Sequence, residues 1–127
     1  MRDDVRALGM AAGMAGSGVL HLVRPQLYDW MIPPELGAAR PWVTASGVAE
    51  LATAALLSLP VTRRAGGWAA AAVLLGVLPA HVQTLRVHRD DGWRLAVAAA
   101  RIPVQLPLLQ AALRVARARD PRACPPV

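Results

Sequence analysis

The stretch Pro41–Pro60, PWVTASGVAELATAALLSLP, contains the costliest residue of the chain and decides how the rest must be arranged. It is about twenty residues long and nearly uncharged, which is the length and polarity of a helix that crosses a bilayer. Its one charge, Glu50, lies at the midpoint. A carboxylate at that depth costs about 2.5–3.5 kcal/mol unless it is paired, protonated or reached by water. The remaining sequence is therefore expected to supply the groups that accommodate Glu50.

The composition favours a membrane protein. Of the 127 residues 55 % are hydrophobic, but only 4 % are aromatic and Phe is absent. A soluble core of this size would normally bury aromatic side chains, whereas alanine, leucine and valine suit helices that pack closely in lipid. All 14 basic residues are arginines, and the net charge is +6. Because the arginines lie at the ends of apolar runs and do not gather in one segment, they indicate membrane topology and not a nucleic-acid partner.

The apolar runs predict an all-α fold, an integral membrane four-helix bundle formed by one domain. The predicted helices cover residues 5–23, 42–60, 66–87 and 93–117. Residues 24–41 contain four prolines and are predicted to form a surface loop, and the tail 118–127 is expected to be disordered. The aromatic residues expected to anchor the bundle at the membrane interface are Tyr28, Trp30, Trp42, Trp68 and Trp93.

The distribution of arginines predicts the orientation. Four spans place both termini on one side, and cytoplasmic segments carry the excess of positive residues. We therefore expect a multi-pass protein of the cell membrane with both termini in the cytoplasm. The arginines on the terminal side are Arg2, Arg6, Arg63, Arg64, Arg114, Arg117, Arg119 and Arg122, and those on the opposite side are Arg24, Arg40, Arg86, Arg89 and Arg94.

The first predicted helix carries a small or polar residue at every fourth position. Gly9, Gly13, Ser17 and His21 share one face of a helix at this spacing. Small residues at that interval allow two helices to approach closely, so this face is expected to pack against a neighbour and to turn His21 into the bundle.

Polar residues within the predicted helices converge on the outer half of the membrane. Glu50 follows Pro41 by nine residues and Arg101 follows Trp93 by eight. Both charges therefore lie about 12–14 Å below the outer surface, at 1.5 Å per residue. Four other polar residues of the predicted helices lie within about one helical turn of this depth or nearer the outer membrane surface. They are His21, Ser46, His81 and Gln105. Together they predict a ligand-binding pocket that is open to the outer side and formed by His21, Ser46, Glu50, His81, Arg101 and Gln105.

Glu50 and Arg101 have two compatible interpretations. They form an ion pair that fixes the register of the helices, or they line the polar pocket, or both. For His21 and His81 the simplest expectation is a hydrogen bond to a backbone carbonyl. Axial ligation of a haem by the two histidines is a weaker alternative, since the bundle would have to accommodate a macrocycle and the histidines lie at shallow depth. A metal site formed by the histidines and Glu50 is equally weak, since Arg101 would repel a cation. No catalytic residue is predicted.

Four stretches of the chain follow one another in a recognisable order. They are GVLHLVRPQLYDWMIPPEL, VTASGVAELATAALLSLPVTRRAGGW, GVLPAH and RIPVQLPLL, and their order resembles the DoxX family of small membrane proteins. The resemblance implies a four-helix membrane bundle associated with a redox complex. His81 departs from the pattern, because DoxX proteins carry an Asn at this place.

The sequence thus predicts an accessory or binding subunit of a redox or quinone-linked membrane complex, not an enzyme that acts alone. A quinone or a lipid is the expected ligand, with its polar head in the outer pocket. The expected partners are the lipid bilayer and a membrane redox protein or further copies of the chain. Two alternatives remain: a small-solute transporter or channel that works as an oligomer, and a purely structural protein in which Glu50 and Arg101 only fix the register.

Overall fold

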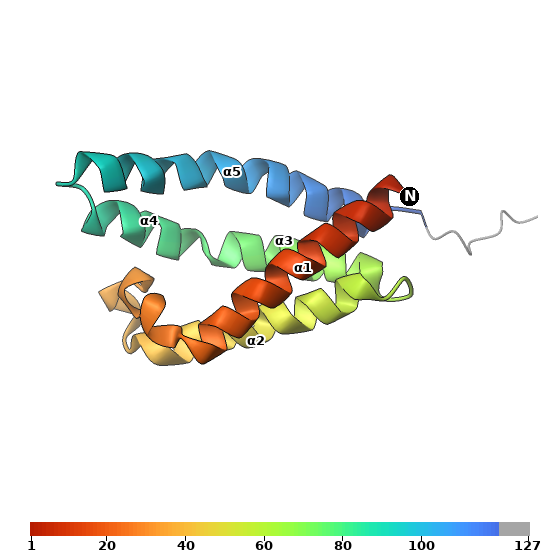
Figure 1. Cartoon of the computed structure of the whole chain (residues 1–127), viewed down its shortest axis with the longest axis horizontal. Coiled ribbons are helices and arrows are strands. Elements are labelled where there is room, and N and C mark those ends of the chain that lie inside the picture. The colour runs from red at the N-terminus through yellow and green to blue at the C-terminus, as the bar shows by residue number, and fades with distance from the viewer. Residues whose placement is uncertain (120–127) are drawn as a thin grey trace, which may run out of the picture.

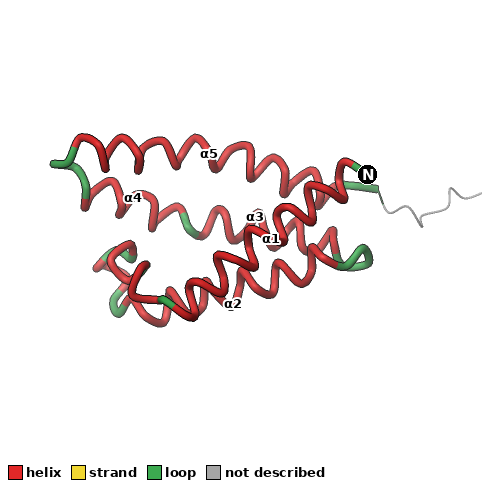
Figure 2. Tube along the Cα trace, viewed as in Figure 1, coloured by secondary structure: helices red, strands yellow, loops and turns green. Residues whose placement is uncertain are grey.

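The computed structural model describes residues 1–119, and this part of the chain is entirely helical, without strands. Of the predicted disordered tail, residues 120–127 lie outside the described residues. The chain order is shown in Figures 1 and 2. The α-helices are α1 (Arg2–Val23), α2 (Ala39–Ser58), α3 (Arg63–Gly76), α4 (Leu78–Val87) and α5 (Gly92–Arg117), and the short 3-10 helices between α1 and α2 are η1 (Pro25–Leu27), η2 (Asp29–Met31) and η3 (Pro34–Leu36).

Residues 1–119 form five α-helices instead of the predicted four, because the predicted third helix breaks at Val77. Pro79 has no N–H and cannot donate to the carbonyl four residues before it. The chain makes a 3-10-type hydrogen bond here, in which the N–H of Ala80 donates to the carbonyl of Val77, three residues earlier, at 3.1 Å. The two helices still follow one another along one rod, with a short irregular link between them (Figure 2).

Two helical rods are long and apolar enough to cross a membrane. They are Arg63–Val87, with 25 residues, and Gly92–Arg117, with 26. Length and composition alone would also fit a core helix of a soluble protein. However, only 22 % and 11 % of the most apolar windows of these rods are buried, so most of their apolar surface faces outward.

Glycines bring the helices together in two close pairs. Gly18 of α1 faces Gly47 of α2, where a Cβ on Gly18 would lie 2.9 Å from the Gly47 carbonyl oxygen. Gly67 of α3 faces α5, where a Cβ would lie 2.4 Å from the backbone nitrogen of Ala116. Any side chain at these positions would force the backbones apart, so α1 pairs with α2 and α3 pairs with α5.

The predicted contact face of the first helix is only partly correct. Gly9 and Gly13 are exposed, and a Cβ placed on either glycine would have no atom of another segment within 4 Å, so they touch no neighbouring helix. The residues of α1 that are buried are Ala7, Ala11 and Gly18. The four-residue spacing therefore did not identify the packed glycine, because Gly18 lies outside the predicted set and alanines make part of the contact.

The two helix pairs join at the end of the bundle that holds both described termini, which we call the inner end (Figure 1). The opposite end, which holds the 3-10 helices and the turn between α4 and α5, is the outer end. In the inner half a cluster of buried small and branched side chains fills the space between the helices. Its members are Ala7, Ala11, Leu57, Ala70, Ala71, Ala112 and Val115. Toward the outer end α1 runs diagonally away from α5 (Figure 1).

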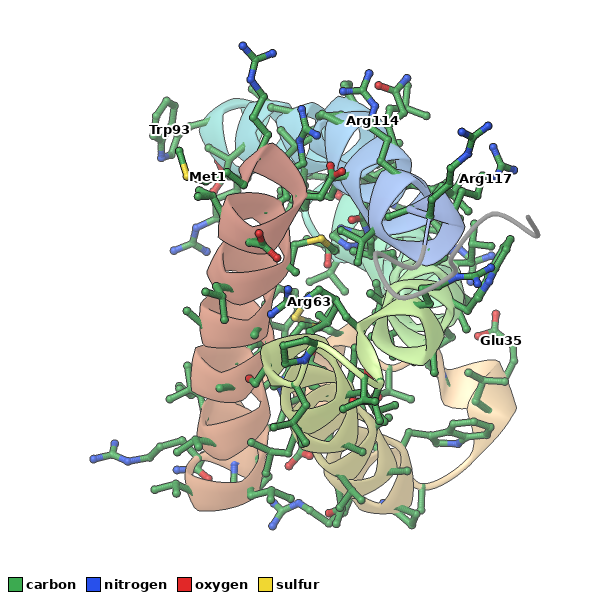
Figure 3. All side chains as sticks on the ribbon, turned by 90° about the vertical axis from the view of Figure 1, so that its right-hand side faces the viewer. Met1, Glu35, Arg63, Trp93, Arg114 and Arg117 are labelled. Atoms are coloured by element: carbon green, nitrogen blue, oxygen red, sulfur yellow. The ribbon has the colours of Figure 1, made fainter. Side chains whose placement is uncertain are left out.

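Arg63 closes the inner end between α1 and the turn that follows α2 (Figure 3). Its guanidinium donates to the Leu57 carbonyl at 3.0 Å and to the Asp4 carboxylate, and its side chain is only 15 % exposed. A cation at this place also interacts favourably with the carbonyl end of α2. Arg114 and Arg117, in contrast, are exposed.

Substitution of two glycines by alanine tests the close pairing. Gly67→Ala should destabilise the protein by about 1–3 kcal/mol, because the new Cβ overlaps the α5 backbone. Gly13→Ala makes the same change in open space and should be neutral or stabilising by up to about 1 kcal/mol, as alanine favours helix. Denaturation in mild detergent, followed by circular dichroism, measures both. Equal effects of the two substitutions would contradict the close contact of α3 and α5.

Candidate functional site

A cavity of about 450 Å³ lies in the outer half of the bundle, between the two diverging helix pairs. We call it the outer cavity. Both helix pairs contribute to its wall, and the segment with the 3-10 helices covers it. Its polar or charged lining residues are Ser17, His21, Tyr28, Ser46, Glu50, His81 and Arg101, and the covering segment adds apolar side chains at Met31, Ile32, Pro33 and Leu36.

Of the six residues predicted to form a pocket, five lie on this wall and Gln105 does not. Gln105 lies behind His81, where its Nε2 donates to His81 Nε2 at 3.0 Å and to the Leu74 carbonyl at 3.4 Å. Because His81 Nε2 accepts in this arrangement, the ring proton is on Nδ1. Within residues 1–119 this Nδ1 is buried without a hydrogen-bond partner.

The Glu50 carboxylate meets His21. Its Oε2 atom lies 3.2 Å from His21 Nδ1, and Glu50 is only 7 % exposed. The same Nδ1 donates its proton to the Ser17 carbonyl at 2.7 Å, so its approach to Glu50 is a close polar contact and not a hydrogen bond. Oε2 consequently has no hydrogen-bond partner in the described part of the chain. The histidine thus makes the backbone bond expected of it and also accommodates the acid.

The predicted ion pair between Glu50 and Arg101 is not formed. Among residues 1–119, no carboxylate lies within 4.0 Å of the Arg101 guanidinium, although Arg101 lines the same cavity as Glu50. The reason is the close pairing of α1 and α2: a Cβ at Gly47 would lie 2.8 Å from the Cβ of His21, so His21 sits directly over α2. Equal depth along two helices does not determine which neighbour a side chain reaches.

Tyr28 covers the acidic side of the cavity. Its ring stacks on His21, with centroids 3.8 Å apart and planes inclined by 13°. Burial raises the pKa of the Tyr28 phenol, the charge of Glu50 adds to the rise, and the charge of Arg101 opposes it. The phenol therefore lies within electrostatic reach of both opposite charges. Tyr28 was predicted only as an interfacial anchor, and its position over His21 depends on the fold of the loop.

Ion pairs hold the covering segment in place. Asp29 pairs with Arg40 at the start of α2 at 2.7 Å, and Glu35 pairs with Arg86 of α4 at 3.0 Å. A backbone hydrogen bond lowers the pKa of the Glu35 carboxyl, and Arg86 lowers it further, while partial desolvation opposes them. The segment is thereby connected to both helix pairs.

The other aromatic residues lie away from the cavity except Trp42. Trp42 lines it and donates from Nε1 to the Leu36 carbonyl at 3.0 Å. Trp30, Trp68 and Trp93 are 43 %, 51 % and 77 % exposed. This exposure fits the predicted interfacial role, which stays a prediction.

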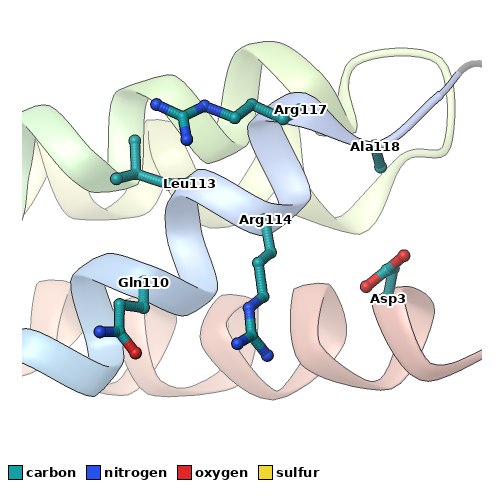
Figure 4. A pocket seen from close by; sticks show the side chains of 6 residues that line it. All are labelled: Asp3, Gln110, Leu113, Arg114, Arg117 and Ala118. Atoms are coloured by element: carbon teal, nitrogen blue, oxygen red, sulfur yellow. The ribbon is translucent and has the colours of Figure 1, made fainter.

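One further groove is less suitable as a binding site, and the metal alternative is not formed in the described chain. A groove of about 420 Å³ at the inner end runs between α1 and α5, with Gln110 and Arg114 directed toward α1 (Figure 4). It is formed mainly by exposed side chains, and its acid, Asp3, already pairs with Arg6 at 2.7 Å. No group of three metal-ligating side chains occurs within residues 1–119, so the alternative metal site of His21, His81 and Glu50 is not formed.

A double-mutant cycle distinguishes the two possible partners of Glu50. The Glu50→Gln and His21→Gln substitutions should be coupled by about 1 kcal/mol or more in unfolding free energy, because the two side chains are in contact. The Glu50→Gln and Arg101→Gln pair should be coupled by less than about 0.5 kcal/mol. Chemical denaturation in detergent provides both values. A larger coupling to Arg101 would restore the pairing that was predicted from depth.

Comparison with known proteins corrects the predicted resemblance to the DoxX family. No curated protein matches the chain. No solved structure matches it either. A family model described as a domain of unknown function, DUF8561, matches residues 10–116, which include every residue of the outer cavity. The DoxX assignment was therefore wrong, because short motifs shared in order do not establish a family. The chain belongs to the DUF8561 family.

Proposed function

We propose that this protein spans the membrane several times and binds the polar headgroup of an amphipathic molecule in the outer cavity. The observation that carries the proposal is the position of Glu50, His21 and Arg101 around one cavity in the outer half of the bundle. Charged groups at such depth are costly in lipid and mark functional sites. A mostly apolar cavity with a few polar groups is also the usual form of a small-molecule site.

The outer surface of the helices supports a membrane location. Large apolar side chains are exposed on every α-helix of the described chain, and the buried core is built mainly from alanine. A soluble monomer rarely exposes so much contiguous apolar surface. Each α-helix has such side chains with exposed fractions of 45–63 %: Leu8 and Val19 on α1, Val48 on α2, Leu75 on α3, Val82 on α4 and Leu106 on α5.

The arginines support an orientation with the inner end in the cytoplasm, since more of them belong to that end. The outer cavity would then open toward the extracytoplasmic side. The cluster around Leu57 fills the inner half below the cavity, which favours binding over passage of a solute through the chain. A quinone or a lipid-like molecule suits such a site, with its head among the polar groups and its tail between helices or in lipid.

Replacement of Glu50 tests the proposal. Glu50→Gln should leave membrane insertion intact but weaken binding of the headgroup by about tenfold, the effect of one lost charge-assisted hydrogen bond. The probes are a decyl-tailed hydroquinone and dodecanol, whose hydroxyl groups can donate to the Glu50 carboxylate, added to the protein in phosphatidylcholine nanodiscs. Tryptophan fluorescence reports binding, because Trp42 lines the cavity.

Asp90→Asn is the matched control, because its exposed carboxylate lies outside both the cavity lining and the covering segment. It should leave probe binding unchanged. The proposal fails if the wild-type protein binds neither probe, or if Glu50→Gln and Asp90→Asn bind both probes as the wild type does. Extraction of the protein from membranes by alkaline carbonate would contradict the membrane location.

A further inference from the structure

One charge of the outer cavity has no counter-charge in the described chain. Arg101 lies nine residues after the start of α5, about 13 Å along the helix from its outer end. Its side chain is exposed, and no carboxylate within residues 1–119 lies within 4.0 Å of it. A guanidinium in the middle of a membrane helix is unfavourable unless an anion or water reaches it. The cavity therefore presents an unneutralised cation.

The cavity also contains hydrogen-bond donors that have no partner among the described residues. His81 Nδ1 carries its proton and is buried without a partner, since Gln105 occupies Nε2. The hydroxyl of Tyr28 makes no hydrogen bond to any residue of the described chain, and Tyr28 lines the same cavity. Donors with a cation recognise an acceptor that bears negative charge.

Glu50 determines where in the cavity that charge can lie. Its carboxylate is already in contact with His21 at 3.2 Å, and it would repel a second anion placed beside it. The negative oxygen of a ligand therefore belongs on the Arg101 side. Glu50 Oε2 is buried and lacks a hydrogen bond within residues 1–119, so a hydroxyl or N–H of the same headgroup that reached it would satisfy it.

A second depression leads to Arg101 along α5. Its volume is about 470 Å³, and it shares Arg101 with the outer cavity. His88 and Arg94 also line it, whereas no acidic side chain does. A basic approach of this kind raises the local concentration of anions. The remaining lining residues are Trp30, Thr84, Trp93, Val97 and Ala98.

We propose that the outer cavity is selective for an amphipathic molecule with an anionic headgroup, a carboxylate or a phosphate, bound by Arg101 and His81 Nδ1. This inference rests on the proposed function and adds the charge of the ligand. The apolar side chains over the cavity, such as Met31, Ile32 and Leu36, favour a ligand that also has a hydrocarbon tail. A lipid headgroup and a soluble anion share the same charge, so the test includes both.

Binding of four probes to the protein in phosphatidylcholine nanodiscs tests the selectivity. Dodecanoate and dodecyl phosphate should bind about tenfold more tightly than dodecanol, which has the same chain without the charge. Inorganic phosphate should compete only weakly, because it has no tail. Equal affinity for dodecanoate and dodecanol would overturn the anionic headgroup and leave the proposed function standing. Binding of none of the amphiphiles would overturn both, and tight binding of inorganic phosphate would overturn the requirement for a tail.

Arg101 substitutions locate the selectivity. Arg101→Gln should abolish the preference for dodecanoate over dodecanol while binding of dodecanol persists, and Arg101→Lys should restore part of the preference. Arg89→Gln is the matched control, because Arg89 is exposed at the same end of the bundle and lines neither depression. Retained selectivity in a folded Arg101→Gln protein would overturn the assignment. Circular dichroism establishes that each variant is folded. If a variant does not fold, the comparison of dodecanoate with dodecanol on the wild-type protein still tests the selectivity for an anionic headgroup.

Discussion

The close approach of backbones at glycine is the constraint on which the rest of this structure depends. Gly18 meets Gly47, and Gly67 meets Ala116, at separations that exclude any Cβ. Where the driving force is contact between helices and not exclusion of water, small residues give the largest gain in packing. The chain thus forms two tight pairs, and the alanine-rich cluster joins these pairs only in the inner half. The outer half is left open for the cavity and its covering loop.

The same contact determines the chemistry of the cavity. Because α1 lies so close to α2 at Gly47, His21 is brought to 3.2 Å from the Glu50 carboxylate. A buried carboxylate needs a nearby positive or donor group, and the histidine supplies it from the adjacent helix. Arg101, on the other helix pair, is left facing the cavity without an acid of its own among the described residues. Charge separation across the cavity is therefore a consequence of which helices pair, and it makes the site suited to a ligand with distinct donor and acceptor ends.

The proposed membrane location and the proposed binding function have different support. The proposed location rests on apolar side chains exposed along all the described helices and on two rods long enough to cross a bilayer. The proposed binding function rests on the residues around one cavity and does not depend on the family, since DUF8561 is described only as a domain of unknown function. The redox association that the DoxX resemblance implied has no support in the structure. What remains is a pocket whose chemistry can be tested directly.

The sequence alone determined the helices and the level of the polar residues, because both follow from local hydrophobicity and from the rise per residue. Its predicted helix ends lie within a few residues of those of α1, α2 and α5. It also identified most of the polar residues that line the cavity, with the exception of Ser17 and Tyr28. The spacing of four residues between Ser17 and His21 could have revealed Ser17. It missed the break at Val77, although Pro79 was the signal for it.

The tertiary structure decided that His21 and not Arg101 reaches Glu50, that Tyr28 stacks over the pair, and that Gln105 stands behind His81. These contacts depend on rotation and pairing of helices, and periodicity along a chain specifies a face and a depth without specifying the neighbour.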